Sequence, residues 1–157
     1  MADLIEAAGD KARLLYAGVV TPHRSCGICL AETFNLPTRP FQALRRGGLT
    51  GEGQCGAIIA GQLILGIMLG DPNPTGSVTP RLRQGMLYYQ RSWRTRLGMQ
   101  ATDSIVCNDL TRPLGDFFGM ERTSACTRIA GAVAESVQEA LEATGSGVHI
   151  TPIELTR

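Results

Sequence analysis

Five cysteines are the residues of this chain best suited to do chemistry, and they are spread over most of its length. They are Cys26, Cys29, Cys55, Cys107 and Cys126. Thiolates bind soft metals and attack disulfides, so a group of cysteines can hold a metal centre or exchange electrons. Their spacing matches neither the two close pairs of a zinc ribbon nor the compact runs of bacterial ferredoxins. Any shared site must therefore be assembled from segments that are distant in the sequence.

The stretch "SCGIC" at 25–29 holds the only close pair, Cys26 and Cys29. Such a pair can form a redox-active dithiol, contribute to a metal site, or consist of two core residues, because free cysteine often packs as a small hydrophobe. A thioredoxin-like dithiol needs a strand followed by a helix, and the sequence shows no such setting around these residues. We therefore expect that the two cysteines do not act as a unit.

Three of the thiols fall where the sequence predicts the start of a helix. Cys26 follows the potential cap Ser25, Cys55 follows the glycine-rich segment 45–54, and Cys126 follows two further potential caps. The glycine-rich segment lacks the Gly-Lys-Ser/Thr of a P-loop, so we expect it to be the turn that delivers Cys55. At a helix start, unpaired backbone N–H groups and the helix dipole stabilise a thiolate. We expect these thiols to converge if the helices begin at one end of a bundle.

Helical periodicity dominates the chain and predicts an all-α fold. Apolar residues recur at helical spacing over about 2–18, 25–36, 55–70, 82–97, 103–111 and 123–144. Glycine and proline separate these segments at 45–54 and 71–80. The sequence thus predicts a single helical domain over 1–157, a bundle of about five to six helices with a short irregular or β-like C-terminal tail.

Composition and charge indicate an ordinary globular protein, with 43% hydrophobic and 18% charged residues and a net charge of +1. We expect the arginine-rich segment 81–96 to be a solvated helix face, and we expect no nucleic-acid partner. The N-terminal residues lack the features of a secretory signal, and the longest apolar stretch is shorter than the ~18 residues of a membrane span. These features predict a cytoplasmic protein without a membrane segment, in which thiols stay reduced.

Four segments, taken in order, resemble the family called C_GCAxxG_C_C, small cytoplasmic helical proteins described as redox-active. Between about residues 20 and 140 these segments are "SCGICLAETF", "GGLTGEGQCGAIIAGQLILGIMLG", "SIVCNDL" and "SACTRIAGAVAESVQEAL". The chain departs from the family pattern at two points. Ala60 stands at the position of the motif glycine, with Gly61 next to it, and Cys29 is additional to the four characteristic cysteines.

The resemblance implies an iron–sulfur protein, because a similar domain in split-Soret cytochromes is associated with such a cluster. It implies that the ligands of a [2Fe–2S] or [4Fe–4S] cluster are Cys26, Cys55, Cys107 and Cys126, with Cys29 as an extra ligand or a substituted core residue. The leading hypothesis is electron transfer or redox sensing with an unidentified redox partner.

Two alternatives stay open at this point. The first is a metal-free thiol–disulfide oxidoreductase that uses Cys26 and Cys29, and the second is a module whose cysteines hold zinc or a small ligand. The small residues of the segment 55–70 would also suit a homodimer contact. The sequence assigns no catalytic residue.

Overall fold

The computed structural model describes residues 2–154, with side chains from residue 4 onward, and this part of the chain is helical. The elements are α1 (Ala2–Ala17), α2 (Cys26–Thr33), the 3₁₀ helix η1 (Arg39–Leu44), α3 (Gly56–Leu69), α4 (Pro80–Leu97), α5 (Cys107–Thr111), the 3₁₀ helix η2 (Arg112–Leu114) and α6 (Met120–Ala143). The all-α prediction is confirmed, and the two 3₁₀ helices are additional to the helices expected. The tail is irregular up to residue 154, and its last residues lie outside the described part.

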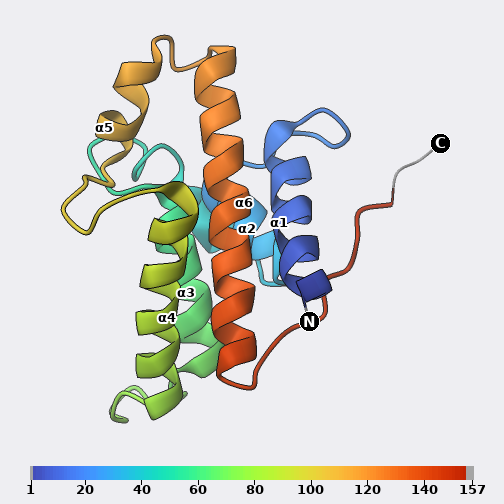
Figure 1. Ribbon diagram of the computed structural model, residues 1–157, viewed down its shortest axis with the longest axis vertical. Helices are drawn as coiled ribbons and strands as arrows, with labels where there is room; N and C mark the ends of the chain where they lie inside the picture. The colour runs from blue at the N-terminus through green and yellow to red at the C-terminus, as the bar shows by residue number, and fades with distance from the viewer. Residues whose placement is uncertain (1, 155–157) are drawn as a thin grey trace.

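The long helix α6 is the centre of the bundle (Figure 1). Helices α1 and α4 pack along it on either side, and α2 and α3 also contact it. Alanines make this possible, because α6 presents small, fully buried side chains such as Ala130, Ala134 and Ala140. Larger side chains from the surrounding helices, Phe34 and Trp93 among them, fill the core around these positions. The arrangement brings the first turns of α6 close to the loops that precede α3 and α5.

Helix α3 is apolar on all sides, and its sequence therefore predicts a fully buried helix. Its neighbours α2, α4 and α6 cover only part of its circumference. Leu63 and Ile67 on the remaining face are 46% and 58% exposed. Within residues 2–154, no helix combines the length and the apolar character needed to cross a bilayer.

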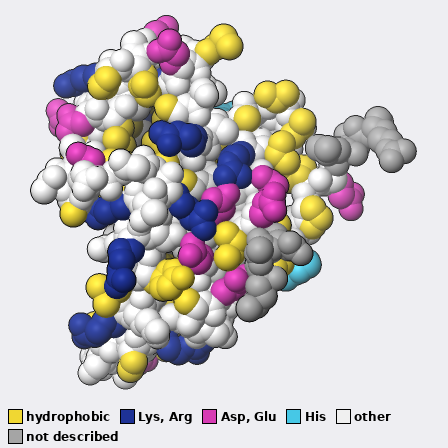
Figure 2. All heavy atoms as spheres, in the orientation of Figure 1, with side chains coloured by type: hydrophobic (Ala, Val, Ile, Leu, Met, Phe, Trp, Pro, Cys, Tyr) yellow, Lys and Arg dark blue, Asp and Glu magenta, His cyan; other side chains and the backbone are white. Residues whose placement is uncertain are grey.

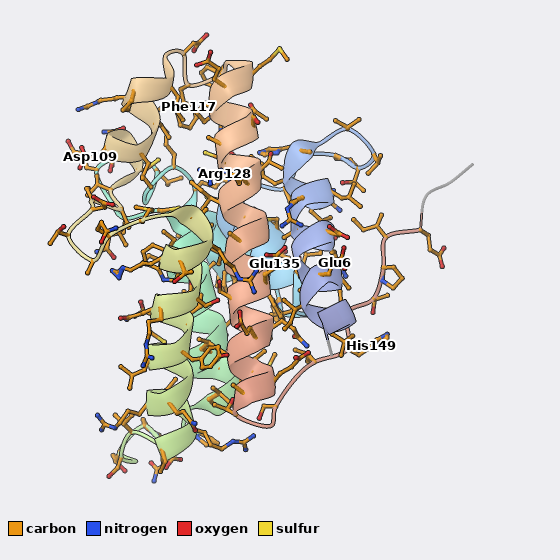
Figure 3. All side chains as sticks on the ribbon, in the orientation of Figure 1. Glu6, Asp109, Phe117, Arg128, Glu135 and His149 are labelled. Carbon is orange, nitrogen blue, oxygen red and sulfur yellow. The ribbon has the colours of Figure 1, made fainter. Side chains whose placement is uncertain are left out.

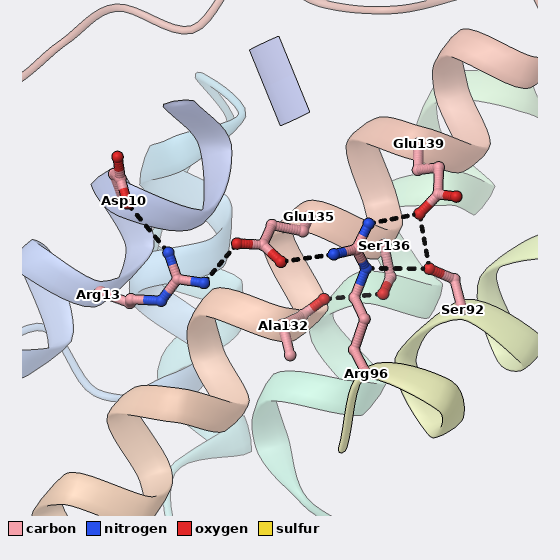
Figure 4. A network of polar contacts seen from close by, with 8 residues as sticks. All are labelled: Asp10, Arg13, Ser92, Arg96, Ala132, Glu135, Ser136 and Glu139. Carbon is pink, nitrogen blue, oxygen red and sulfur yellow. Dashed lines mark hydrogen bonds and ion pairs between the residues drawn. The ribbon is translucent and has the colours of Figure 1, made fainter. Parts of the chain in front are cut away.

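An ion-pair network joins α1, α4 and α6 (Figure 4). Glu135 of α6 accepts hydrogen bonds from Arg13 of α1 and from Arg96 of α4, and Arg96 also donates to Glu139 at 2.7 Å. On the face seen in Figure 2, basic side chains over α4 lie beside acidic side chains over α6. Part of the positive charge of the segment 81–96 is therefore neutralised within the molecule.

Candidate functional site

A cavity of about 400 Å³ lies at the end of the bundle where α6 begins, and four of the five cysteines line it. Cys26 is the first residue of α2, Cys55 directly precedes α3, Cys107 is the first residue of α5, and Cys126 lies in the second turn of α6. A volume of this size is within the range of about 300–1,000 Å³ that is typical of small-molecule and cofactor sites. The structure thus brings together the four cysteines that the resemblance groups, each in or next to a different helix.

Cys29 is the cysteine that does not line this cavity. It is completely buried, and its thiol donates to the carbonyl oxygen of Cys26 at 3.1 Å. Burial raises the pKa of the Cys29 thiol well above its usual value. The side chain packs as a small core residue one turn after Cys26, on the side of α2 that faces the protein interior.

Backbone hydrogen bonds fix Cys55 and Cys107 next to each other. The N–H of Cys55 donates to the carbonyl oxygen of Ile105 at 2.7 Å, and the N–H of Cys107 donates to that of Gly53 at 2.9 Å. Both bonds belong to one short antiparallel contact between the loops that precede α3 and α5. The two thiols are therefore held by the main chain at their own residues, and their separation does not depend on side-chain packing alone.

The glycine-rich segment before Cys55 is a turn, as predicted, and its conformation is left-handed. Four consecutive residues, Arg46, Gly47, Gly48 and Leu49, have φ of 47°, 57°, 71° and 75°. Gly47 is packed so closely that a Cβ there would lie 2.8 Å from the Cβ of Cys107. The left-handed region costs a residue with a side chain roughly 1–2 kcal/mol. The turn therefore touches the Cys107 segment as well as delivering Cys55.

Gly56, directly after Cys55, explains why a glycine follows the cysteine in this motif. A Cβ at Gly56 would lie 2.2 Å from the carbonyl oxygen of Leu44 and 2.7 Å from the sulfur of Cys26. A real Cβ does not approach a backbone oxygen so closely, so only glycine allows the starts of α2 and α3 to come together here. The close approach places the Cys26 and Cys55 thiols on one cavity wall.

The start of α6 differs from the sequence prediction. The helix begins at Met120 rather than near residue 123, which puts Cys126 in its second turn. Thr123 does not cap the helix, because its hydroxyl donates to the carbonyl oxygen of Gly119, four residues back, at 3.1 Å. Conversely, Cys107 does stand at a helix start, which the sequence did not predict.

Three of the cavity thiols, those of Cys26, Cys55 and Cys107, favour the protonated form in the protein without metal. Burial raises the pKa of Cys26 and of Cys107, and burial together with the nearby Cys26 raises that of Cys55 to about 12. Backbone N–H groups lower the pKa of Cys26 and of Cys55, but their effect is smaller than the cost of desolvating a thiolate. The expectation that a helix start stabilises a thiolate is therefore wrong for Cys26 and Cys55 in the protein without metal.

The raised pKa of Cys55 predicts that the metal-free protein loses stability in alkaline solution. Its ordinary value is 9.0 and its value in the native state is about 12. Between these limits the unfolded chain releases the proton and the native chain retains it, so unfolding is favoured as pH rises; below pH 9 both states hold the proton. Each such thiol lowers the free energy of unfolding by about 1.4 kcal/mol per pH unit.

Urea denaturation at a series of pH values across this window measures the slope. The serine of Cys55→Ser does not titrate in this window. In this variant, the free energy of unfolding should therefore fall less steeply with pH, by the contribution of about one proton. Equal slopes for the native chain and Cys55→Ser would contradict the raised pKa.

The mouth of the cavity is basic and aromatic. Arg45, Arg46 and Arg122 line it together with Phe117, which lies between α5 and the beginning of α6 (Figure 3). The guanidinium carbons of Arg46 and Arg122 lie 4.4 and 4.2 Å from the centroid of the Phe117 ring. Sequence reasoning did not single out Arg46, Phe117 or Arg122, because no local pattern shows that the segments that hold them meet in space.

Arg122 connects this mouth to the thiols through Tyr16 of α1. Its guanidinium donates to the Tyr16 hydroxyl at 2.5 Å. Burial, and then the neighbouring Cys126, raise the pKa of Tyr16, so this hydroxyl stays protonated beside the thiol. Helix α1, which lies outside the segments that resemble the family, thus contributes a side chain to the site.

The four thiols line the wall of a cavity and do not meet at one point. Within residues 2–154, no group of three or more His, Cys, Asp or Glu side chains is arranged to hold a single metal ion. A zinc ion contacts each of its sulfur ligands at about 2.3 Å, whereas thiols around a cavity of about 400 Å³ leave space for a group of several atoms. Comparison of the chain with protein-family models, with curated proteins and with solved structures found no match.

Proposed function

We propose that this chain is a cysteine-based redox protein that binds an iron–sulfur cluster through Cys26, Cys55, Cys107 and Cys126. The observation that carries the proposal is that these four thiols, each in or next to a different helix, line one cavity. Four cysteine thiolates are a complete ligand set for a [2Fe–2S] or a [4Fe–4S] cluster. The resemblance of the surrounding segments to the C_GCAxxG_C_C family points to the same four cysteines.

The surroundings of the thiols fit such a group. Apolar side chains, among them Ala57, Leu110 and Ile129, line the cavity beside them. Buried thiols that are protonated in the metal-free protein must release protons when metal binds, so metal uptake should become stronger as pH rises. A bound cluster would supply one-electron redox chemistry, and the protein would hold it and tune its potential. We infer electron transfer or redox sensing in the cytoplasm, where free thiols persist.

The full chain, purified without oxygen and reconstituted with ferrous iron and sulfide, tests this function. We expect iron and acid-labile sulfide to be taken up together, and we expect visible absorption that bleaches on reduction. A colourless protein that retains neither iron nor sulfide after reconstitution would overturn the proposal. Uptake of zinc by the same four thiols without any uptake of iron and sulfide would favour the zinc-binding alternative.

The dithiol alternative requires that Cys26 and Cys29 can form a disulfide with each other. A resolving thiol must reach the mixed disulfide formed by the attacking thiol, but Cys29 is completely buried and does not line the cavity. Mass spectrometry of the iron-free protein after mild oxidation tests this alternative. A reversible Cys26–Cys29 disulfide, found in a chain that takes up no iron, would favour it over the cluster.

A further inference from the structure

The charged groups on the cavity wall are of one sign. Arg45, Arg46 and Arg122 line the cavity, and no Asp or Glu side chain does. Among the described residues, the ion pairs of the protein lie elsewhere and include Arg13 and Arg96, but none of these three arginines. Like charges around a partly enclosed apolar space repel one another and create a positive potential within it. An anion inside the cavity would therefore be stabilised.

Phe117 holds two of these arginines without neutralising them. The guanidinium carbons of Arg46 and Arg122 both lie within 4.4 Å of the centroid of its ring, and Arg122 also donates to the Phe117 carbonyl oxygen. A cation–π contact fixes the position of a guanidinium while its positive charge remains, whereas a carboxylate partner would cancel that charge. The Phe117 ring therefore holds the guanidinium groups of two distant segments beside the cavity, and both keep their positive charge.

The backbone at Arg46 supports a role for its side chain. Its φ of 47° lies in the left-handed region, which glycine adopts at lower cost than arginine. Strained residues that persist in a fold often belong to functional sites. Arg46, Arg122 and the four cysteines line the same cavity. The two positive charges therefore lie beside the thiols.

We propose that Arg46 and Arg122, held by Phe117, are the counter-charges of the four-thiolate site and raise its reduction potential. This inference rests on the proposed function. A cluster held by four thiolates is anionic, and reduction adds a further electron. Nearby positive charges stabilise the more negative reduced state more strongly than the oxidised state, and net charge is one of the determinants of cluster potential. The two arginines are positioning residues in this account, since they set the field at the cluster and need not touch it.

The double variant Arg46→Gln/Arg122→Gln, reconstituted in the full chain, tests the inference by a redox titration followed by absorption. We expect a midpoint potential more negative than that of the native chain. At a given potential, the ratio of reduced to oxidised protein should fall about tenfold or more, which is about 59 mV for a one-electron couple. Each single variant should give a smaller shift in the same direction.

Arg128→Gln is the matched control. Arg128 is an exposed residue of α6 that does not line the cavity (Figure 3). Its replacement removes one positive charge, as each single glutamine variant does, without changing the cavity wall. Its potential should stay close to that of the native chain. The double variant Arg46→Lys/Arg122→Lys keeps both positive charges, so its midpoint potential should also lie close to that of the native chain.

The outcomes separate this inference from the function on which it rests. If the native chain takes up no cluster, both are overturned. If the glutamine double variant loads normally and its potential equals that of Arg128→Gln, the function stands and the counter-charge role is overturned. If the glutamine double variant is folded by circular dichroism but takes up no cluster, loading by the lysine variant would support the charge requirement, and failure of the lysine variant as well would overturn it.

Discussion

Replacement of Cys55 with serine is expected to abolish cluster uptake, and the same result is expected for Cys26, Cys107 and Cys126. Each of these thiols lines the cavity, and each lies in or next to a different helix. The remaining cysteine, Cys29, shares α2 with Cys26 but is buried outside the cavity wall, so we expect no other thiol to take the place of a lost ligand. Changes in residues that only support a metal ligand typically cost about 10–100-fold in metal affinity, so the loss of a ligand should cost more. Iron and acid-labile sulfide per chain, measured after identical reconstitution, give the result directly.

Cys29→Ser is the control for this series, because it makes the same chemical change outside the cavity wall. The serine hydroxyl can donate to the Cys26 carbonyl oxygen as the thiol does at 3.1 Å. We therefore expect Cys29→Ser to fold, to take up iron and sulfide at the native level, and to show the native spectrum. Loss of the cluster in Cys29→Ser, or full retention in any of the other four variants, would show that the ligand assignment is wrong.

Alanine in place of Gly56 is expected to damage both the fold and the site. Its Cβ would lie 2.2 Å from the carbonyl oxygen of Leu44, which is backbone and cannot move aside without shifting the chain after η1. It would also lie 2.7 Å from the sulfur of Cys26. Overpacking of this kind costs about 1–3 kcal/mol, and any shift that relieves it moves Cys26 away from Cys55. We expect a lower urea midpoint and poor cluster uptake.

Gly66→Ala provides a matched control within the same helix. A Cβ at Gly66 meets no atom within 4 Å, so the added methyl group has space. In the interior of a helix, alanine is more stable than glycine by about 0.5–1 kcal/mol, and Gly66→Ala should therefore be neutral or slightly stabilising with native cluster uptake. Equal effects of the two substitutions would show that the close approach at Gly56 does not matter.

The helices themselves could be predicted with little error, because helical periodicity is a local property. The predicted segment 82–97 corresponds to α4 (Pro80–Leu97), and 55–70 corresponds to α3 (Gly56–Leu69). The start of α6 was less predictable, since Thr123 and Ser124 have the side chains of helix caps, and the structure uses Thr123 inside the helix. A cap and an interior threonine are distinguished by which backbone group the hydroxyl meets, and the sequence does not contain that information.

For the cysteines, too, the features that depend on nearby residues could be predicted, and those that depend on distant residues could not. The local sequence around Cys26 and Cys29 lacks the strand and helix of a thioredoxin-like dithiol, which is enough to doubt that they form a pair. The protonation of the thiols could not be predicted in the same way. Local sequence indicates a helix start, which lowers a thiol pKa, but the extent of burial depends on the residues that the rest of the chain packs around it.

The grouping of four cysteines apart from Cys29 was implied by the resemblance of four segments to a family. By itself, the sequence of this protein determined an all-α fold and the approximate helix bounds. Those two features depend on residues within a few turns of one another, where spacing along the chain is also spacing in the structure. Only the tertiary structure decided that the four thiols share one cavity and that Phe117 holds Arg46 and Arg122 at its mouth. These contacts join segments far apart in the chain, and their distances follow from how whole helices pack against α6.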